Sequence, residues 1–327
     1  NSSRFVLRSA LTSAGKSVAP LVTIGLPVYN GGQFLATALD SLLGQTFTDF
    51  ELIISDNAST DATEEICREY ARADARVRYQ RSSENRGFTW NSNRVVELAA
   101  GKFFKWAAHD DSCLPTLLER CVETLQSESP SVVLAYPRSK VINEHGAVLW
   151  EHWDRLDLRD STPHKRLIQL VRNPPNMGTS IYGLMRTSAL RQTRGLGDFL
   201  SPDYVLLAEL ALLGEFREIP ELLFLKRHHA SMSREANPTL EAVADWIKPG
   251  SGNRVILEYW NLFYEHLASI HGAPLGILDR TRCYAVFVPM WARLWRRRLV
   301  MELAGLPKEL RRVRAARNLS ARARGSS

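Results

Sequence analysis

The feature that most constrains the fold is an alternation of apolar, strand-like runs and amphipathic, helix-like segments between residues 21 and 135. β-Rich apolar runs favour buried strands, and apolar residues at helical spacing favour helices that pack on a sheet. This alternation predicts an α/β fold, Rossmann-like, with a mainly parallel sheet flanked by helices. Strands are expected at 21–27, 50–54, 77–79, 101–107 and 131–135, and helices at 34–43, 90–100 and 114–126, with a further helix after residue 61.

Beyond residue 138 the alternation weakens. The pattern there predicts helices at 164–171 and 203–213, strands at 216–219 and 222–225, and a mostly helical segment from about residue 240.

Three of the expected strands run directly into polar loops, which begin at Tyr29, Asp56 and His109. The carboxyl ends of parallel strands lie at one edge of a sheet, and ligands of open α/β sheets bind there. We therefore expect the three loops to converge on one cleft.

The triplet His109-Asp110-Asp111 follows an apolar strand. Adjacent carboxylates are costly to ionise together without a cation nearby, and oxygen ligands select hard cations such as Mg²⁺ or Mn²⁺. The other interpretation is that Asp111 or Ser112 caps a helix beginning near residue 114.

Several ordered motifs resemble the family 2 glycosyltransferases, which have the GT-A nucleotide-diphospho-sugar transferase fold. The resemblance covers roughly residues 20–235. It implies a GT-A catalytic domain at 20–235. The Ser- and Ala-rich stretch before it is expected to be a tail at 1–19, and the mostly helical, Arg-rich stretch after it is expected to be a C-terminal helical, basic extension at 236–327. The matching segments are 22–30, 45–47, 51–61, 85–87, Gly101, 109–111 and 219–229.

The resemblance implies a nucleotide-sugar site in the loops after the first two strands. In it the turn Pro27, Val28, Tyr29 and Asn30, together with Asp56 and Asn57, forms the pocket for base and ribose, and Arg86 contacts phosphate or base. A carboxylate can accept the imide N–H of uracil or thymine, so UDP or dTDP is favoured over GDP. The bland alternatives are that Asp56 braces its loop and that Arg86 is a surface arginine.

The resemblance also implies a metal site. Asp111 would bind Mn²⁺ or Mg²⁺, and Asp110 would face the ribose. His109 stands where an Asp is commoner, which leaves the role of that position open. Further along, Arg227 and His229 match an Arg-x-His pattern: His229 would be a further metal or diphosphate ligand, and Arg227 would offset leaving-group charge. Two adjacent histidines can also be plain surface residues.

For the catalytic base the resemblance points to Asp203, in a Ser-Pro-Asp-Tyr stretch where Pro202 replaces the usual Glu. The alternative is that Ser201 or Asp203 caps the following helix, with Asp198 and then Glu209 as the next candidates for the base. On the acceptor side the matching residues are Asn176, Gly178 and Thr179, in a loop that can also be a plain connector.

Charge is concentrated at the C-terminal end. Residues 280–327 hold 13 of the 42 Lys and Arg residues but two of the 35 Asp and Glu residues, a net charge of +11, so the rest sums to −4. Trp291 and Trp295 share a helix face next to the arginines. This suits an interfacial helix on an anionic membrane, and equally packing onto the catalytic domain or a homodimer partner. No aromatic-basic motif supports nucleic acid as a partner.

Together these features predict a metal-dependent, inverting glycosyltransferase. It would move a sugar from a nucleotide-diphosphate donor to a hydroxyl of a saccharide or lipid-linked acceptor, in bacterial surface polysaccharide or glycolipid synthesis. The chain contains no apolar run of spanning length and no recognisable leader, so the expected location is the cytoplasm, peripheral at the inner face of the cytoplasmic membrane. The alternative is a non-catalytic nucleotide-sugar-binding or membrane scaffold protein.

Overall fold

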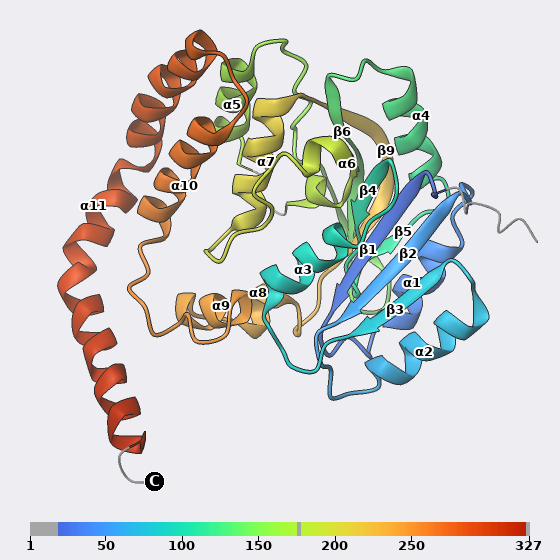
Figure 1. Ribbon diagram of the computed structural model, residues 1–327, viewed down its shortest axis with the longest axis horizontal. Helices are drawn as coiled ribbons and strands as arrows, with labels where there is room; N and C mark the ends of the chain where they lie inside the picture. Colours follow the sequence, from blue (N-terminus) through green and yellow to red (C-terminus); the bar gives the residue numbers. More distant parts are fainter. Residues whose placement is uncertain (1–18, 175–177, 325–327) are drawn as a thin grey trace, which may run out of the picture.

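The computed structural model describes residues 19–174 and 178–324, with the side chains of 233–234 and 316–324 left aside. One twisted sheet crosses the molecule, and helices lie on both of its faces (Figure 1). The predicted α/β architecture with a C-terminal helical region is therefore confirmed.

The sheet has nine strands within the described residues, in the order β3-β2-β1-β4-β8-β6-β9-β5, with β7 beside β6. β1 pairs in parallel with β2 and β4, and β2 with β3, as the alternation predicts. The other half is mixed, because β8 runs antiparallel to both β4 and β6 while β9 runs parallel to β6. The strands are β1 Val22–Val28, β2 Phe50–Asp56, β3 Val77–Arg81, β4 Phe103–Trp106, β5 Ser112–Cys113, β6 Val132–Ile142, β7 Val148–His152, β8 Leu184–Arg186 and β9 Glu215–Arg227.

Two apolar clusters hold the helices on the sheet. One contains residues of α1, α2 and α4, and the other contains residues of α3, α5, α7, α10 and α11. α7 is buried on all sides, which fits a helix that is apolar all round. The helices are α1 Leu35–Leu43, α2 Thr63–Ala73, α3 Phe88–Glu97, α4 Leu117–Ser127, α5 Pro163–Arg172, the 3₁₀ turn η1 Thr179–Tyr182, α6 Thr187–Leu190, α7 Pro202–Leu213, α8 Ser233–Ala236, α9 Leu240–Ile247, α10 Glu258–Gly272 and α11 Ile277–Arg324.

Two local predictions are wrong. The strands expected at 216–219 and 222–225 are one strand, β9. The pairing of β6 with β9 shifts register between Ile219 and Leu222. Pro220 lies at this irregularity, where a residue without a backbone N–H does not interrupt the strand. Ser112 does not cap a helix, and neither does Asp111. Ser112 pairs with Leu225 of β9, and α4 begins three residues later than expected.

The C-terminal helices complete the second cluster and are not a separate body. Trp291 is 1% exposed, and its ring lies 5.2 Å from that of His266 and 5.5 Å from that of Phe287. Trp295 is partly buried against Tyr259, with 4.8 Å between the ring centroids. Both tryptophans therefore pack against the C-terminal helices, while α11 itself packs on α5. Packing onto the catalytic domain was one of the open alternatives. One apolar cluster thus holds residues from both sides of the boundary expected at residue 235, and that boundary stays a prediction.

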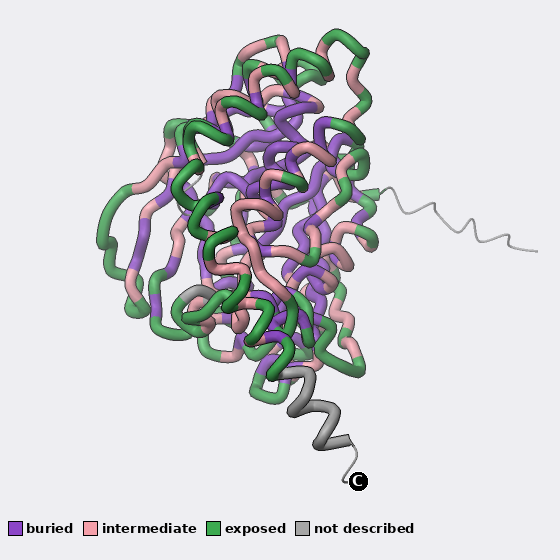
Figure 2. The backbone as a smooth tube through the Cα atoms, turned by 90° about the vertical axis from the view of Figure 1, so that its left-hand side faces the viewer, coloured by how far each residue is buried: buried purple, intermediate pink, exposed green. Residues whose placement is uncertain are grey.

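α11 continues through Pro289 and Pro307. Glu302 of this helix accepts hydrogen bonds from the backbone N–H groups of Tyr259 and Trp260, at 2.9 and 3.2 Å, and so caps the start of α10. Of residues 303–315 only Val313 is buried, and the tube just ahead of the grey C-terminal turns in Figure 2 is mostly green and pink. None of the described helices combines the length and apolar character needed to cross a bilayer.

Candidate active site

The loops after β1 and β2 are joined by hydrogen bonds at the carboxyl edge of the sheet. Asn30 N–H donates to Ser59 Oγ, and Gly31 N–H donates to Thr63 Oγ1, both at 2.9 Å. Asn30 has a left-handed backbone, with φ of 51°, and its side-chain oxygen accepts from Thr60 N–H at 2.8 Å. These bonds give the first two polar loops one shared conformation.

The third loop closes on the same place. The His109 ring packs on Gly31, where a Cβ atom would lie 2.7 Å from the ring, so a side chain at Gly31 would push the loops apart. His229, just beyond β9, meets the ring of Phe34 edge-on at 4.7 Å. The predicted convergence of the loops at Tyr29, Asp56 and His109 is thus seen in the structure.

Asp56, predicted in the nucleotide pocket, has no exposed surface. One carboxylate oxygen accepts from Ser59 N–H at 2.8 Å, and the other accepts from Tyr79 Oη at 2.8 Å and lies 3.2 Å from Arg81 Nε. In this conformation Asp56 braces its loop, and a nucleotide base could reach the carboxylate only if these partners moved. Direct base contact by Asp56 stays a prediction.

Asn57 and Arg86 lie side by side, because Asn57 organises the 85–87 turn. Its Nδ2 donates to Asn85 Oδ1 at 2.8 Å, and its Oδ1 accepts from Arg86 N–H at 3.0 Å. The exposed Arg86 guanidinium lies over the Trp90 ring at 4.2 Å. An arginine held flat on an aromatic ring is a ready partner for a phosphate or a base.

The four residues of the predicted 27–30 turn differ in exposure. Tyr29 is 41% exposed and Asn30 is exposed, so both are available to a ligand. Val28 is 1% exposed, and its carbonyl already accepts from Asn57 N–H and Asn91 Nδ2. The Val28 side chain therefore belongs to the core and not to the pocket, while Pro27 is half-buried at the end of β1.

A cluster of opposite charges forms where the β4 loop meets the end of β9. Asp110 Oδ2 lies 3.0 Å from His229 Nε2, and Asp111 Oδ2 lies 3.5 Å from Lys226 Nζ. Arg227 N–H donates to Asp111 Oδ1 at 2.8 Å. Sequence reasoning missed Lys226, although it stands directly before the Arg-x-His pattern.

Burial and neighbouring charges shift the pKa values of Asp110 and Asp111 in opposite directions. Burial raises the pKa of Asp111 above its usual value, against the lowering effect of the Lys226 charge. Burial would also raise the pKa of Asp110, but the charges of His109 and Lys226 and the bond with His229 hold it below the usual value. Desolvation disfavours the Lys226 ammonium, yet the carboxylates, led by Asp111, raise its pKa. The site thus keeps a lysine cation beside an acidic pair.

Arg227 does not present its charge to this cluster. Its guanidinium donates to the carbonyls of Asp110, Asn143 and Glu144 at 2.9 to 3.1 Å, and the residue is 5% exposed. The side chain therefore ties the β4 loop to the turn after β6. Lys226, and not Arg227, is the cation that lies against the acids.

The donor set at this corner has the chemistry of a site for a hard cation. His229 Nδ1 is buried, and no partner for it is found among the described residues, which leaves that nitrogen open to a ligand. Two carboxylates and an imidazole suit Mn²⁺ or Mg²⁺, and Mg²⁺ commonly takes one or two protein carboxylates and completes its shell with water and substrate phosphates. Within the described ranges no three His, Cys, Asp or Glu side chains are grouped closely enough to hold a metal ion by themselves. The residues fit a cation shared with a phosphate-bearing ligand.

Asp203, the predicted base, is the second residue of α7 and lies against Gly178. A Cβ atom on Gly178 would lie 2.9 Å from Asp203 Oδ2. Burial raises the pKa of Asp203, although nearby N–H groups of the first helical turn, led by that of Tyr204, lower it. Ser201 makes no capping hydrogen bond.

Tyr182 connects the base candidate to the acidic pair. Burial raises the pKa of its phenol to about 12, and the charges of Asp111, Asp110 and Asp203 act in the same direction. The Lys226 ammonium lies 5.1 Å from the centre of its ring. Lys226, Asp110, Asp111 and Asp203 therefore all lie within electrostatic range of this phenol, which places Asp203 in the neighbourhood of the acidic pair.

The other two candidates for the base are engaged by other side chains. Asp198 accepts hydrogen bonds from Thr89 Oγ1 and Lys248 Nζ. Glu209 accepts from Arg194 and Ser269, on the side of α7 that faces α10.

The acceptor-side candidates lie in the turn before β8. Gly178 has a left-handed backbone, with φ of 59°, and Thr179 is 3% exposed. The Thr179 hydroxyl and Ser180 N–H both donate to the buried Asp154 carboxylate, at 3.3 and 2.6 Å. Asp154, which sequence reasoning missed, therefore holds this turn beside Asp203. Asn176 lies outside the described residues.

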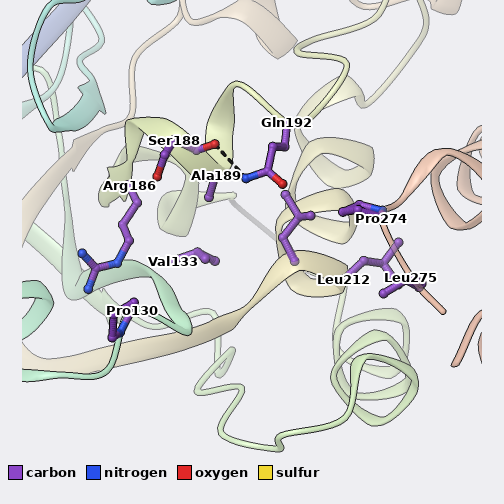
Figure 3. A pocket seen from close by; sticks show the side chains of 10 residues that line it. Pro130, Val133, Arg186, Ser188, Ala189, Gln192, Leu212, Pro274 and Leu275 are labelled. Carbon is purple, nitrogen blue, oxygen red and sulfur yellow. Dashed lines mark hydrogen bonds between the residues drawn. The ribbon is translucent and has the colours of Figure 1, made fainter.

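A cavity of about 240 Å³ lies elsewhere, between β6, α6, the end of α7 and the link from α10 to α11 (Figure 3). Arg186 lines it, and its guanidinium donates to the carbonyls of Val132 and Leu125 at 2.7 Å. The cavity shares no residue with the predicted site. Its lining is Pro130, Val133, Arg186, Ser188, Ala189, Gln192, Leu212, Leu213, Pro274 and Leu275.

Comparison with known proteins identifies the family to which the chain belongs. Residues 23–194 match the model for "Glycosyl transferase family 2". The chain is 26% identical to the chondroitin synthase of Escherichia coli over 229 residues, which is 68% of this chain and 31% of that protein. It is 32% identical to an uncharacterised glycosyltransferase of Rickettsia prowazekii (strain Madrid E) over 132 residues, 40% of each protein. The chain thus spans well under half the length of these relatives.

Among solved structures, S. aureus TarS 1–349 in complex with UDP-GlcNAc superposes with a TM-score of 0.58 at 14% identity, covering 89% of this chain and 81% of that one. Such a likeness shows a shared GT-A-like fold. With a family match over more than half of its length, the chain belongs to glycosyl transferase family 2.

Proposed function

We propose that this enzyme moves a sugar from a nucleoside diphosphate to a hydroxyl group of a saccharide or lipid-linked acceptor, with inversion at the anomeric carbon. The observation that carries the proposal is the corner around Tyr182. A lysine cation beside two carboxylates and the half-buried carboxylate of Asp203 all lie within electrostatic range of its phenol.

The donor side uses the three loops. Tyr29 and Arg86 offer an aromatic ring and a stacked guanidinium to the nucleoside and its phosphates, and the buried Asn57 holds the turn that carries Arg86. Asp110 accepts a hydrogen bond from a ribose hydroxyl. The Lys226 ammonium stabilises the negative charge that develops on the diphosphate as it leaves. Asp111 and His229 would hold Mn²⁺ or Mg²⁺ together with the diphosphate, where a divalent cation neutralises leaving-group charge.

The acceptor side uses Asp203. Its carboxylate takes the proton of the acceptor hydroxyl while that oxygen forms the new bond to the anomeric carbon. The bond from that carbon to the diphosphate oxygen breaks on the opposite face, and the nucleotide keeps the electron pair. The transition state is oxocarbenium-like, as in other glycosyl chemistry. Because burial raises its pKa, Asp203 is a stronger base than an ordinary surface aspartate.

UDP and dTDP are the favoured nucleotides of the donor, and GDP is the alternative. TarS 1–349, a structural neighbour, is described in complex with UDP and with UDP-GlcNAc, which supports this choice. A relative named chondroitin synthase supports a polysaccharide acceptor. We place the reaction in bacterial surface polysaccharide or glycolipid synthesis, at the inner face of the cytoplasmic membrane.

The test is nucleotide release from UDP-, dTDP- and GDP-sugars by the full chain, with Mn²⁺ and with EDTA. We expect release from a UDP- or dTDP-sugar with Mn²⁺ and its loss in EDTA and in Asp111→Asn. Asp49→Asn, an exposed aspartate at the other end of the strands, is the matched control and should behave as wild type. Binding of a nucleotide-sugar without release from any donor would instead identify a non-catalytic binding protein.

A further inference from the structure

One face of α11 is turned away from the protein and carries unneutralised positive charge. Arg293, Arg296, Val300 and Leu303 follow one another at helical spacing and are all exposed. Leu299, which faces inward, is 9% exposed, and the stripe continues beyond Leu303 through exposed Arg311 and Arg314. Figure 1 draws α11 along the edge of the molecule, on the side away from β1–β3.

The acidic residues of this part of the helix do not balance the stripe. Glu302 is turned inward and caps α10. Glu309 pairs with Arg312, which also lies 3.3 Å from Glu241. Among the ion pairs of the described residues, none involves Arg293, Arg296 or Arg297. The positive charges of these three arginines are therefore not neutralised by an ion pair within the described residues.

Large apolar side chains stand exposed among these arginines. Leu294 is 47% exposed, Val300 61%, Met301 65% and Leu303 50%. In water each exposed apolar surface is unfavourable, and four within ten residues form a concentrated patch. Since Trp291 and Trp295 pack inward, these four side chains, and not the tryptophans, are the apolar groups that this stretch of α11 offers to a partner.

We propose that this face of α11, defined by Arg293, Arg296, Arg297, Val300, Met301 and Leu303, docks on the surface of an anionic lipid bilayer. A bilayer interface meets both features at once: lipid headgroups supply negative charge, and the acyl boundary receives apolar side chains. A nucleic acid offers phosphates but no apolar phase for Val300 and Met301. The proposal is independent of the chemistry proposed above.

The expected affinity follows from the charges. Each basic residue within a Debye length of an anionic leaflet strengthens binding by roughly fivefold, so three arginines contribute roughly 100-fold. Because this attraction is screened by salt, binding should be reversible and weaken as ionic strength rises. The body of the protein, with its net charge of −4 before residue 280, adds no attraction.

The experiment is co-sedimentation of the full chain with phosphatidylcholine vesicles, with or without 30% phosphatidylglycerol, at roughly 50 and 500 mM salt. We expect sedimentation with the anionic vesicles at low salt, release at high salt and little binding to neutral vesicles. Arg293→Glu/Arg296→Glu/Arg297→Glu should lower the partition coefficient at least 100-fold. Met301→Gln/Leu303→Gln should lower it severalfold with the charge unchanged.

A matched control makes the same charge change elsewhere. Arg72, Lys102 and Arg172 are exposed residues outside α11, and their triple replacement by Glu should leave more than half of the low-salt binding intact. Thermal melts of all variants confirm that each is folded. Equal losses in the two triple variants, or no wild-type binding at low salt, would overturn the proposal. So would light scattering that shows a dimer lost in the α11 triple variant while vesicle binding persists.

Discussion

Replacing Lys226 by methionine removes the cation beside Asp111 and should destabilise the protein. The two charged groups are 3.5 Å apart, and their side chains are 15% and 2% exposed. Breaking a buried pair leaves an uncompensated charge and costs about 3–5 kcal/mol. We expect the low end, about 3 kcal/mol, because Asp111 can take up a proton once the lysine charge is gone. In a chain of this size that corresponds to a fall in Tm of roughly 4 °C.

The pH dependence of this loss has a definite sign. Burial already raises the pKa of Asp111, and the Lys226 charge opposes that shift. In Lys226→Met the folded-state pKa rises further, so ionised Asp111 destabilises the fold above that pKa and ceases to do so once it is protonated at lower pH. The difference in free energy of unfolding between wild type and variant should therefore be larger at pH 8 than at pH 5.

Urea denaturation of a double-mutant cycle with Asp111→Asn measures the pair itself. The double variant should be more stable than the sum of the single losses implies, by about 1 kcal/mol or more. The control is Arg120→Met, which breaks a 2.8 Å pair with Glu221 whose side chains are 46% and 41% exposed. That loss should be about 0–1 kcal/mol. Additive single losses, or a Lys226→Met loss no larger than the control, would refute the reasoning.

Three further predictions follow from other contacts. Asp203→Asn should lower kcat about 10²–10⁴-fold with donor affinity unchanged, and the acidic limb of the wild-type pH–rate profile should lie above pH 3.8 because burial raises the pKa of Asp203. Unchanged turnover with a lowered Tm would make Asp203 a structural residue. Trp291→Ala should cost about 3–5 kcal/mol in urea denaturation, and a loss below 1 kcal/mol would contradict its burial at 1% exposure. Tyr79→Phe removes a 2.8 Å bond to buried Asp56 and should cost about 1–3 kcal/mol, and an unchanged urea midpoint would show that the brace is dispensable.

The first half of the fold could be predicted from the sequence because each element there has one environment. β1 and β2 are buried on both faces and read as continuous apolar runs, while α1 has a single apolar stripe. The convergence of the Tyr29, Asp56 and His109 loops followed from parallel strand direction alone. β8 could not be predicted as antiparallel, because its three residues carry no signal of direction.

The errors at the site and in α11 have one physical origin, which is that residue type does not tell which neighbour a side chain meets. Arg227 and Lys226 are adjacent cations on β9, yet one bonds to carbonyls and the other lies against Asp111. Trp291 and Val300 lie on opposite faces of one helix, and either face could have been the inner one. Only the packing of α10 and α5 decides that Trp291 is buried.

The shared core of the early and late helices has a consequence for the order of events during translation. α3 and α7 leave the ribosome before α10 and α11, yet all four contribute to one apolar cluster. Until the late helices arrive, the apolar side chains of α7 that will face them stay uncovered, and α10 lacks its cap from Glu302. Nascent chains in that state are open to aggregation, and they can complete the fold only after about residue 302 has emerged.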